Sequence, residues 1–228
     1  MYKSCLLESI SFTLKRNTNL FDDYERQQLD SIISLSVASE IQSECCSSAL
    51  TLISRMILRK HEWLKSSSFS EYLISYPSSE RNLSCAEVAD SNCILSNALR
   101  FLLTKEFIDV IDPCATNLRG SILSFEALWS AVEDSFSTPE IVELHRTVAN
   151  GKCQLSRKSD ILNAIRKIIA TQKNVLGLSL RDDFHKLVIR ALKRASNAPS
   201  IIVRIKPSIT SLLRRVQRLY QVRKPAWQ

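Results

Sequence analysis

Glycine is nearly absent from this chain, with only three among 228 residues. Glycine supplies the left-handed conformations of tight hairpin turns and the close backbone approach of phosphate-binding loops. A sheet-rich protein with many short turns is therefore not expected, and neither a Walker loop nor a dinucleotide-binding glycine fingerprint is present. The sequence predicts a mainly helical protein.

Apolar residues recur at helical spacing in several stretches of the first 135 residues. The predicted helices cover residues 20–35, 49–64, 98–111 and 124–132. Ser124 is the expected N-cap of the last one, and Trp129 is expected in its buried stripe. Residues 66–82 contain seven serines and Pro77, which predicts a loop or a short wing.

A helical hairpin is predicted over residues 137–170. Thr138 is the expected N-cap of its first helix, with Pro139 at the first helical position. Asn150 and Gly151 tolerate the left-handed conformation that ends a helix. The first helix is therefore expected to end there and to be followed by a short basic loop.

The second helix of the hairpin is expected to be capped by Ser156 or Ser159. Its predicted apolar face consists of Ile161, Leu162, Ile165, Ile168 and Ile169. Farther along, residues 187–194 predict another helix, and residues 201–205 predict a brief extended piece. Ser208 is expected to begin a final helix after Pro207, which cannot continue the extended piece.

Charge is distributed very unevenly along the chain. Residues 1–144 hold 12 Lys and Arg against 20 Asp and Glu, whereas residues 145–228 hold 19 against three. The positive charges of residues 145–228 repel one another, and binding a polyanion relieves this repulsion. We favour nucleic acid over a lipid surface as that polyanion, because the segment lacks a Trp- and Phe-rich apolar face. The side chains expected to contact phosphates are Lys152, Arg157, Lys158, Lys167, Arg190, Lys193, Arg194, Arg204, Lys206, Arg214 and Arg215.

No complete catalytic or metal-binding pattern is found, so we predict no catalytic residues, metal ligands or cofactor in this chain. Magnesium-dependent nucleases of the restriction type require an Asp or Glu that is followed two positions later by Lys. This chain has no such pair. The seven cysteines include no C-x-x-C pair, which favours structural thiols in the cytosol or nucleus. Nucleophile–histidine pairs stay open, since their members need not be neighbours in sequence. No stretch reaches the length of a membrane span.

Four segments resemble the Fanconi-associated nucleases, which repair DNA interstrand cross-links. The similar segments are LFDDYERQQLDSIISLS at 20–36, ISRMILRKHEWLK at 53–65, the SAP-like helix pair at 137–170 and VRIKPSITSLLRRVQRLY at 203–220. The most specific part is R-K-x-x-W-L-K, which ends at Lys65. Ser156 stands near the place where many SAP motifs have glycine.

The resemblance implies a winged-helix-like helical domain, a SAP-like hairpin and a basic helical segment that leads to a truncated or absent nuclease part. The expected segments are 1–19, an extension, followed by 20–135, 136–172 and 173–228. In that family a VRR-type nuclease domain with Mg²⁺ or Mn²⁺ cuts 5′ flaps and trims DNA exonucleolytically. We expect a nuclear chain that binds flap or branched duplex DNA without cutting it, with a homodimer on DNA and repair-complex proteins as further partners.

Two other readings stay open. The chain could be a helical adaptor whose basic third docks an acidic protein and which has no role with nucleic acid. It could also be a complete enzyme with an unfamiliar site, although the missing motifs argue against this reading.

Overall fold

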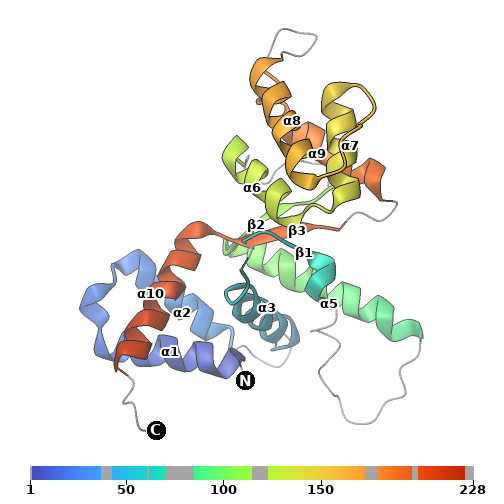
Figure 1. The fold of residues 1–228 in the computed structure, drawn as a ribbon. Coiled ribbons are helices and arrows are strands. Elements are labelled where there is room, and N and C mark those ends of the chain that lie inside the picture. The colour runs from blue at the N-terminus through green and yellow to red at the C-terminus, as the bar shows by residue number, and fades with distance from the viewer. Residues whose placement is uncertain are drawn as a thin grey trace. The chain divides into compact units, whose positions relative to one another are not determined.

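The structure is a computed structural model that describes residues 2–36, 43–60, 62–69, 85–114, 123–172, 179–196 and 200–223. The described residues are mainly helical (Figure 1), which confirms the predicted fold class. In the first half of the chain the elements are α1 (Tyr2–Arg16), the 3-10 helix η1 (Thr18–Leu20), α2 (Asp23–Ser34), α3 (Ser43–Met56), β1 (Leu64–Lys65), the 3-10 helix η2 (Ser66–Phe69), α5 (Cys85–Thr104) and β2 (Ile108–Ile111). The later elements are α6 (Phe125–Ser135), α7 (Thr138–Ala149), α8 (Lys158–Thr171), α9 (Phe184–Ala195), β3 (Ile202–Ile205) and α10 (Pro207–Arg223).

The chain forms two compact units. The first comprises Met1–Lys60, Ser68–Asp109 and Arg204–Gln228, and the second comprises His61–Ser67 and Val110–Val203. This division does not follow the four consecutive segments expected from the sequence, because residues far apart in the chain pack together.

In the first unit, α1 packs against α2, α3 and α10, and α3 packs against α5. The contacts of α10 show how the two ends of the described chain are joined. The Tyr220 hydroxyl donates to the Glu8 carboxylate at 2.6 Å, and its ring meets Phe12 edge to face. Arg215 lies over the Phe21 ring and pairs with Glu25. Glu25 also forms a capping box with Asp22 at the start of α2.

Two helices end earlier in the structure than the sequence predicts. The helix expected to reach residue 64 ends at Met56, and Leu64 and Lys65 instead pair antiparallel with Val203 and Ile202 of β3. The helix expected to reach residue 111 ends at Thr104, and its last residues form β2. The three strands form one sheet in the order β1-β3-β2. Helical spacing cannot reveal a strand whose partner lies more than 90 residues away.

The helix α5 ends at a residue in the left-handed conformation. Glu106 adopts a left-handed conformation with φ 58°, while Phe107 N–H donates to the Leu102 carbonyl and Glu106 N–H to that of Leu103. These two hydrogen bonds form a Schellman motif, and the side chains of Phe107 and Leu102 are both buried. Glutamate thus occupies the position where glycine is preferred.

Replacing Glu106 with glycine should raise the free energy of unfolding by about 0.5–1 kcal/mol, because glycine adopts the left-handed conformation without steric cost. The replacement also removes the ion pair with Lys206, but the Glu106 side chain is largely exposed, so this loss is small. Urea unfolding would measure the change. Glu106→Ala is the matched control, since it removes the same carboxylate and keeps the strained backbone. An equal gain in both variants would contradict the conformational explanation.

The second unit is built around one hydrophobic core. Trp63 from the start of the unit, Trp129 of α6, Ile165 of α8 and Phe184 of α9 are all buried in it. The helix α7 packs against both α8 and α9, and α6 packs against α9. Figure 1 shows α6 to α9 gathered together in this unit. The predicted burial of Trp129 is confirmed.

The hairpin forms as predicted, with small shifts in its caps. Ser137, not Thr138, caps α7, because the Glu140 side chain reaches back to the Ser137 backbone and completes a capping box. Asn150 ends α7 in the left-handed conformation, with φ 51°. Neither Ser156 nor Ser159 caps α8, whose N-cap is Arg157 without a side-chain hydrogen bond.

The remaining local predictions agree with the structure at most positions. Ser124 caps α6 by accepting a hydrogen bond from Ala127 N–H at 3.2 Å. The brief extended piece is β3, and the final helix begins at Pro207, one residue before Ser208. Of the predicted wing over residues 66–82, only 66–69 lie within the described residues, where they form η2.

Candidate nucleic-acid interface

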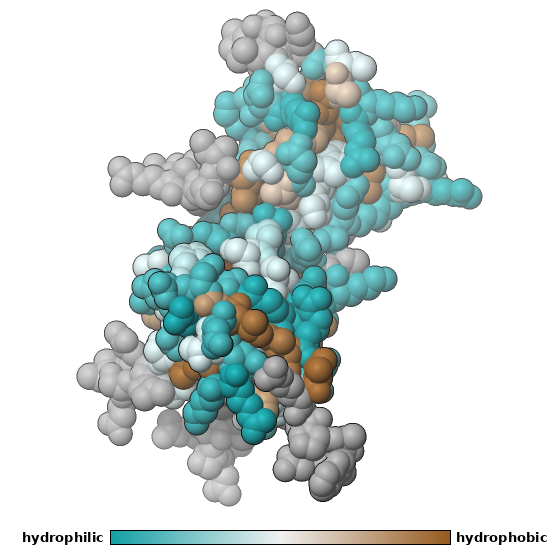
Figure 2. Space-filling model, turned by 90° about the vertical axis from the view of Figure 1, so that its left-hand side faces the viewer, coloured by the Kyte–Doolittle hydropathy of each residue, from teal (hydrophilic) through white to brown (hydrophobic). Residues whose placement is uncertain are grey.

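The uneven charge along the sequence does not produce one acidic and one basic unit. The second unit holds 14 Lys and Arg against 10 Asp and Glu, and the first holds 17 against 13, so each has a formal charge of +4. On the face drawn in Figure 2, hydrophilic side chains cover most of each unit, with hydrophobic atoms showing in strips between them. A candidate interface must therefore be identified from exposed cations that share a face.

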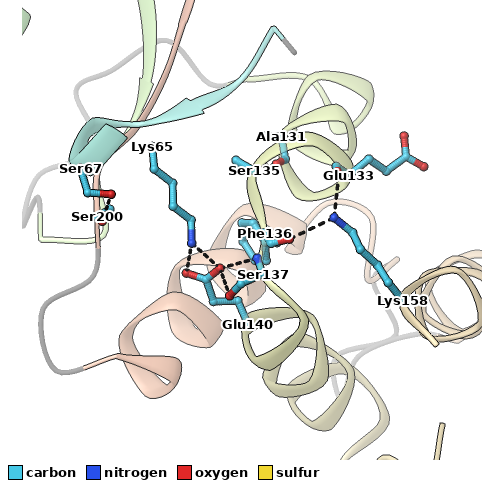
Figure 3. A network of polar contacts seen from close by, with 10 residues as sticks. All are labelled: Lys65, Ser67, Ala131, Glu133, Ser135, Phe136, Ser137, Glu140, Lys158 and Ser200. Atoms are coloured by element: carbon cyan, nitrogen blue, oxygen red, sulfur yellow. Dashed lines mark hydrogen bonds and ion pairs between the residues drawn. The ribbon is translucent and has the colours of Figure 1, made fainter. Parts of the chain in front are cut away.

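Lys158 is held inside the second unit by main-chain contacts (Figure 3). Its Nζ donates to the carbonyls of Glu133 and Phe136, both at 3.0 Å. These carbonyls lie at the C-terminal end of α6, where a cation satisfies groups that lack a helical partner. Lys158 thus links the start of α8 to the end of α6.

The same close-up shows a second lysine with a structural role. Lys65 Nζ contacts both carboxylate oxygens of Glu140, at 2.7 and 2.6 Å, and Glu140 also accepts hydrogen bonds from Ser137 N–H and Oγ (Figure 3). Burial alone would raise the pKa of Glu140, but these hydrogen bonds and the charge of Lys65 outweigh it and hold the pKa below its usual value. The network fastens β1 to the start of α7.

Three of the predicted phosphate contacts belong to the first unit and have acidic partners there. Arg204 Nε donates to Asp109 Oδ2 at 2.8 Å, and the two side chains are only 12% and 10% exposed. Lys206 pairs with Glu106 at 3.4 Å, and Arg215 pairs with Glu25. Arg214, also predicted, is exposed on α10.

The predicted contacts in the second unit are more accessible. Lys152 and Arg157 lie on the exposed hairpin loop and its junction with α8, and Lys167 is exposed on α8. Arg190 and Lys193 are exposed on α9. The side chains of these five residues have no ion-pair partner within the described part of the chain.

One exposed face of α9 gathers cations at helical spacing. Lys186, Arg190 and Lys193 recur at intervals of four and three residues, and Arg194 follows beside them. Lys186 pairs with Asp183 at 2.7 Å, and Arg194 lies 3.9 Å from Glu143. We call these four cations the α9 basic face. Lys186 is not among the contacts predicted from the sequence, although its spacing to Arg190 was a signal for it.

The opposite side of α9 is apolar and buried, which fixes the direction in which the basic face points. Phe184, Val188, Ala191 and Leu192 all lie in the core of the second unit. A helix with one buried apolar side must present its polar side outward. Partial burial lowers the pKa of nearby His185, which disfavours its charged form.

Two further findings concern chemistry and membranes. Within the described residues, no three His, Cys, Asp or Glu side chains lie together in a group that could hold a metal ion. Across the same part of the chain, no helix combines the length and apolar character needed to cross a membrane.

No protein-family model and no curated protein matches this chain in sequence. The candidate interface therefore depends on the geometry of the second unit.

Proposed function

We propose that this chain binds DNA through the α9 basic face, together with the exposed cations of the α7–α8 hairpin. The observation that carries the proposal is the row of Lys186, Arg190 and Lys193 along one outward side of α9. Cations repeated along a helix contact successive phosphates and release the counterions condensed on DNA. Such contacts position a protein on DNA without reading its sequence.

The hairpin adds Lys152, Arg157 and Lys167 to the proposed surface, all exposed and without ion-pair partners among the described residues. We leave out Lys158, because its ammonium group is already bonded to two carbonyls of α6. Arg204 is left out as well, since it is buried against Asp109.

In its finer form the proposal follows the resemblance to the Fanconi-associated nucleases. The hairpin would be a SAP-like element and the preceding helices a winged-helix-like platform, in the DNA-binding region of a nuclear repair protein. Flap or branched duplex DNA would be the ligand. Cleavage with Mg²⁺ or Mn²⁺ would belong to a nuclease domain outside these 228 residues.

The proposal is tested by titrating the purified chain onto a labelled 5′-flap duplex at several salt concentrations. Replacing Arg190 and Lys193 together with alanine should reduce the salt slope of binding by about two units, because each phosphate contact contributes about one. The matched control is Arg214→Ala with Arg218→Ala, which removes the same charge from two exposed arginines of α10 in the first unit. The control should change the slope by less than one unit.

Equal losses in both double variants would mean that overall charge, not the α9 basic face, attracts the DNA. Absence of binding by the unaltered chain at low salt would contradict DNA binding and favour the adaptor reading. Parallel samples with Mg²⁺ report on cleavage, and a cut flap would show that the chain contains a catalytic site of its own.

A further inference from the structure

Two aromatic side chains of α6 form a stack next to the core of the second unit. Phe125 and Trp129 lie one helical turn apart, with ring centroids separated by 6.1 Å and an interplanar angle of 24°. Phe184 of α9 lies against both rings, at 5.0 Å from Phe125 and 5.9 Å from Trp129. Phe184 is fully buried, so it forms a fixed floor beneath the stack.

Each ring of the stack is covered by an arginine. The guanidinium of Arg166, from α8, lies 4.8 Å from the centroid of Trp129. The guanidinium of Arg181 lies 4.6 Å from that of Phe125. Both arginine side chains are more than half exposed, at 58% and 56%. Trp129 is 5% exposed and Phe125 is partly buried, so the two exposed arginines supply part of the cover of rings that otherwise border the core.

Within the described residues, the ion-pair partners of both arginines are exposed glutamates. Arg166 pairs with Glu133 at 3.4 Å, and Arg181 pairs with Glu126. Both glutamates belong to α6. Exposed ion pairs are weak, so these glutamates do little to keep the guanidinium groups over the rings. The Trp129 ring is also oriented by a hydrogen bond of its own, because its Nε1–H donates to the Glu133 carboxylate at 2.6 Å. The indole ring can keep its orientation when Arg166 moves away.

We propose that Trp129 and Phe125 are a stacking platform for unpaired nucleobases, uncovered when Arg166 and Arg181 turn from the rings to the phosphates of a single strand. This inference rests on the proposed function and adds single-stranded DNA to its ligands. A base replaces a planar guanidinium on each ring, and every base has the π-face that such stacking needs. The displaced guanidinium groups supply the positive charge that matches the strand's phosphates.

The test compares three ligands at one salt concentration: an oligothymidine, an abasic strand of the same length and charge, and a blunt duplex. The unaltered chain should bind the oligothymidine about tenfold more tightly than the abasic strand, as expected for stacked bases. Trp129→Leu should abolish this preference and leave the affinity for duplex unchanged. Trp129→Phe, which keeps an aromatic face, should restore most of the preference, whereas a merely structural role would not distinguish the ligands.

Circular dichroism would establish that each variant is folded. If Trp129→Leu is not folded, Phe125→Leu provides the same comparison at a ring that is only partly buried. A folded leucine variant that still prefers oligothymidine over the abasic strand would overturn the stacking platform. Duplex binding without any preference for bases in the unaltered chain would also overturn it, while leaving the proposed function intact. Absence of binding to all three ligands would overturn both.

Discussion

Replacing Asp109 with alanine should lower the free energy of unfolding by about 3 kcal/mol. The change leaves the Arg204 guanidinium without the carboxylate that contacts it at 2.8 Å, at a position where both side chains are nearly buried. Removing one partner of a buried ion pair costs far more than the pair itself contributes, because the remaining charge stays poorly hydrated. Urea unfolding, monitored by circular dichroism, would measure the loss.

Two further variants test the physical reason for this loss. Lys206→Ala removes the neighbouring exposed pair with Glu106 and should cost about 0.5 kcal/mol or less. Combining Asp109→Ala with Arg204→Met should recover most of the stability, since no charge then remains buried. If Asp109→Ala alone cost less than about 1 kcal/mol, Arg204 would have to reach water, and its predicted role as a phosphate contact would regain support.

Replacing Glu140 with glutamine should lower the free energy of unfolding by about 2 kcal/mol at neutral pH, the second large effect that we expect. The variant loses the charge that Lys65 and Ser137 bind and weakens the capping box of α7. Because the pKa of Glu140 is lowered in the folded chain, its contribution is complete above the usual carboxyl value of 4.5. The contribution is lost as the pH falls below that value through the folded pKa.

The pH dependence separates this explanation from a general loss of packing. The difference in stability between the unaltered chain and Glu140→Gln should shrink steadily as the pH falls below 4.5. The matched control is Glu143→Gln on the same helix, whose arginine partners Arg146 and Arg194 are largely exposed. It should cost about 0.5 kcal/mol. A difference for Glu140→Gln that did not vary with pH would contradict the ionic role of the carboxylate.

The sequence could predict the helices because their signals are local. Asp22 and Ser124 precede apolar residues at helical spacing, and Asn150 tolerates the conformation that ends α7. The strands β1 and β2 were assigned to helices because their pairing depends on distant residues, as Lys65 has its partner at Ile202, whereas β3 was predicted as a brief extended piece. Glu106 could not be recognised as a helix end, since glutamate is rare in the left-handed conformation that it adopts there.

The candidate site was only partly predictable for a related reason. A count of charges shows that the last third of the chain is basic, but not which cations have partners. Arg204 and Lys158 look like Arg190 and Lys193 in the sequence, yet their partners are Asp109, nearly 100 residues away, and the carbonyls of α6. The α9 basic face was the most predictable part, because the spacing of its cations is set by the helix itself.

The contacts of α10 with α1 and α2 also bear on how the chain folds during synthesis. Tyr220 and Arg215 meet partners roughly 200 residues earlier, so the first unit cannot complete its packing until the end of the described chain has left the ribosome. All residues of the second unit, in contrast, precede Arg204. The second unit can therefore complete its packing before the first, whose helix α1 lacks its contacts with α10 until residues 207–223 have emerged.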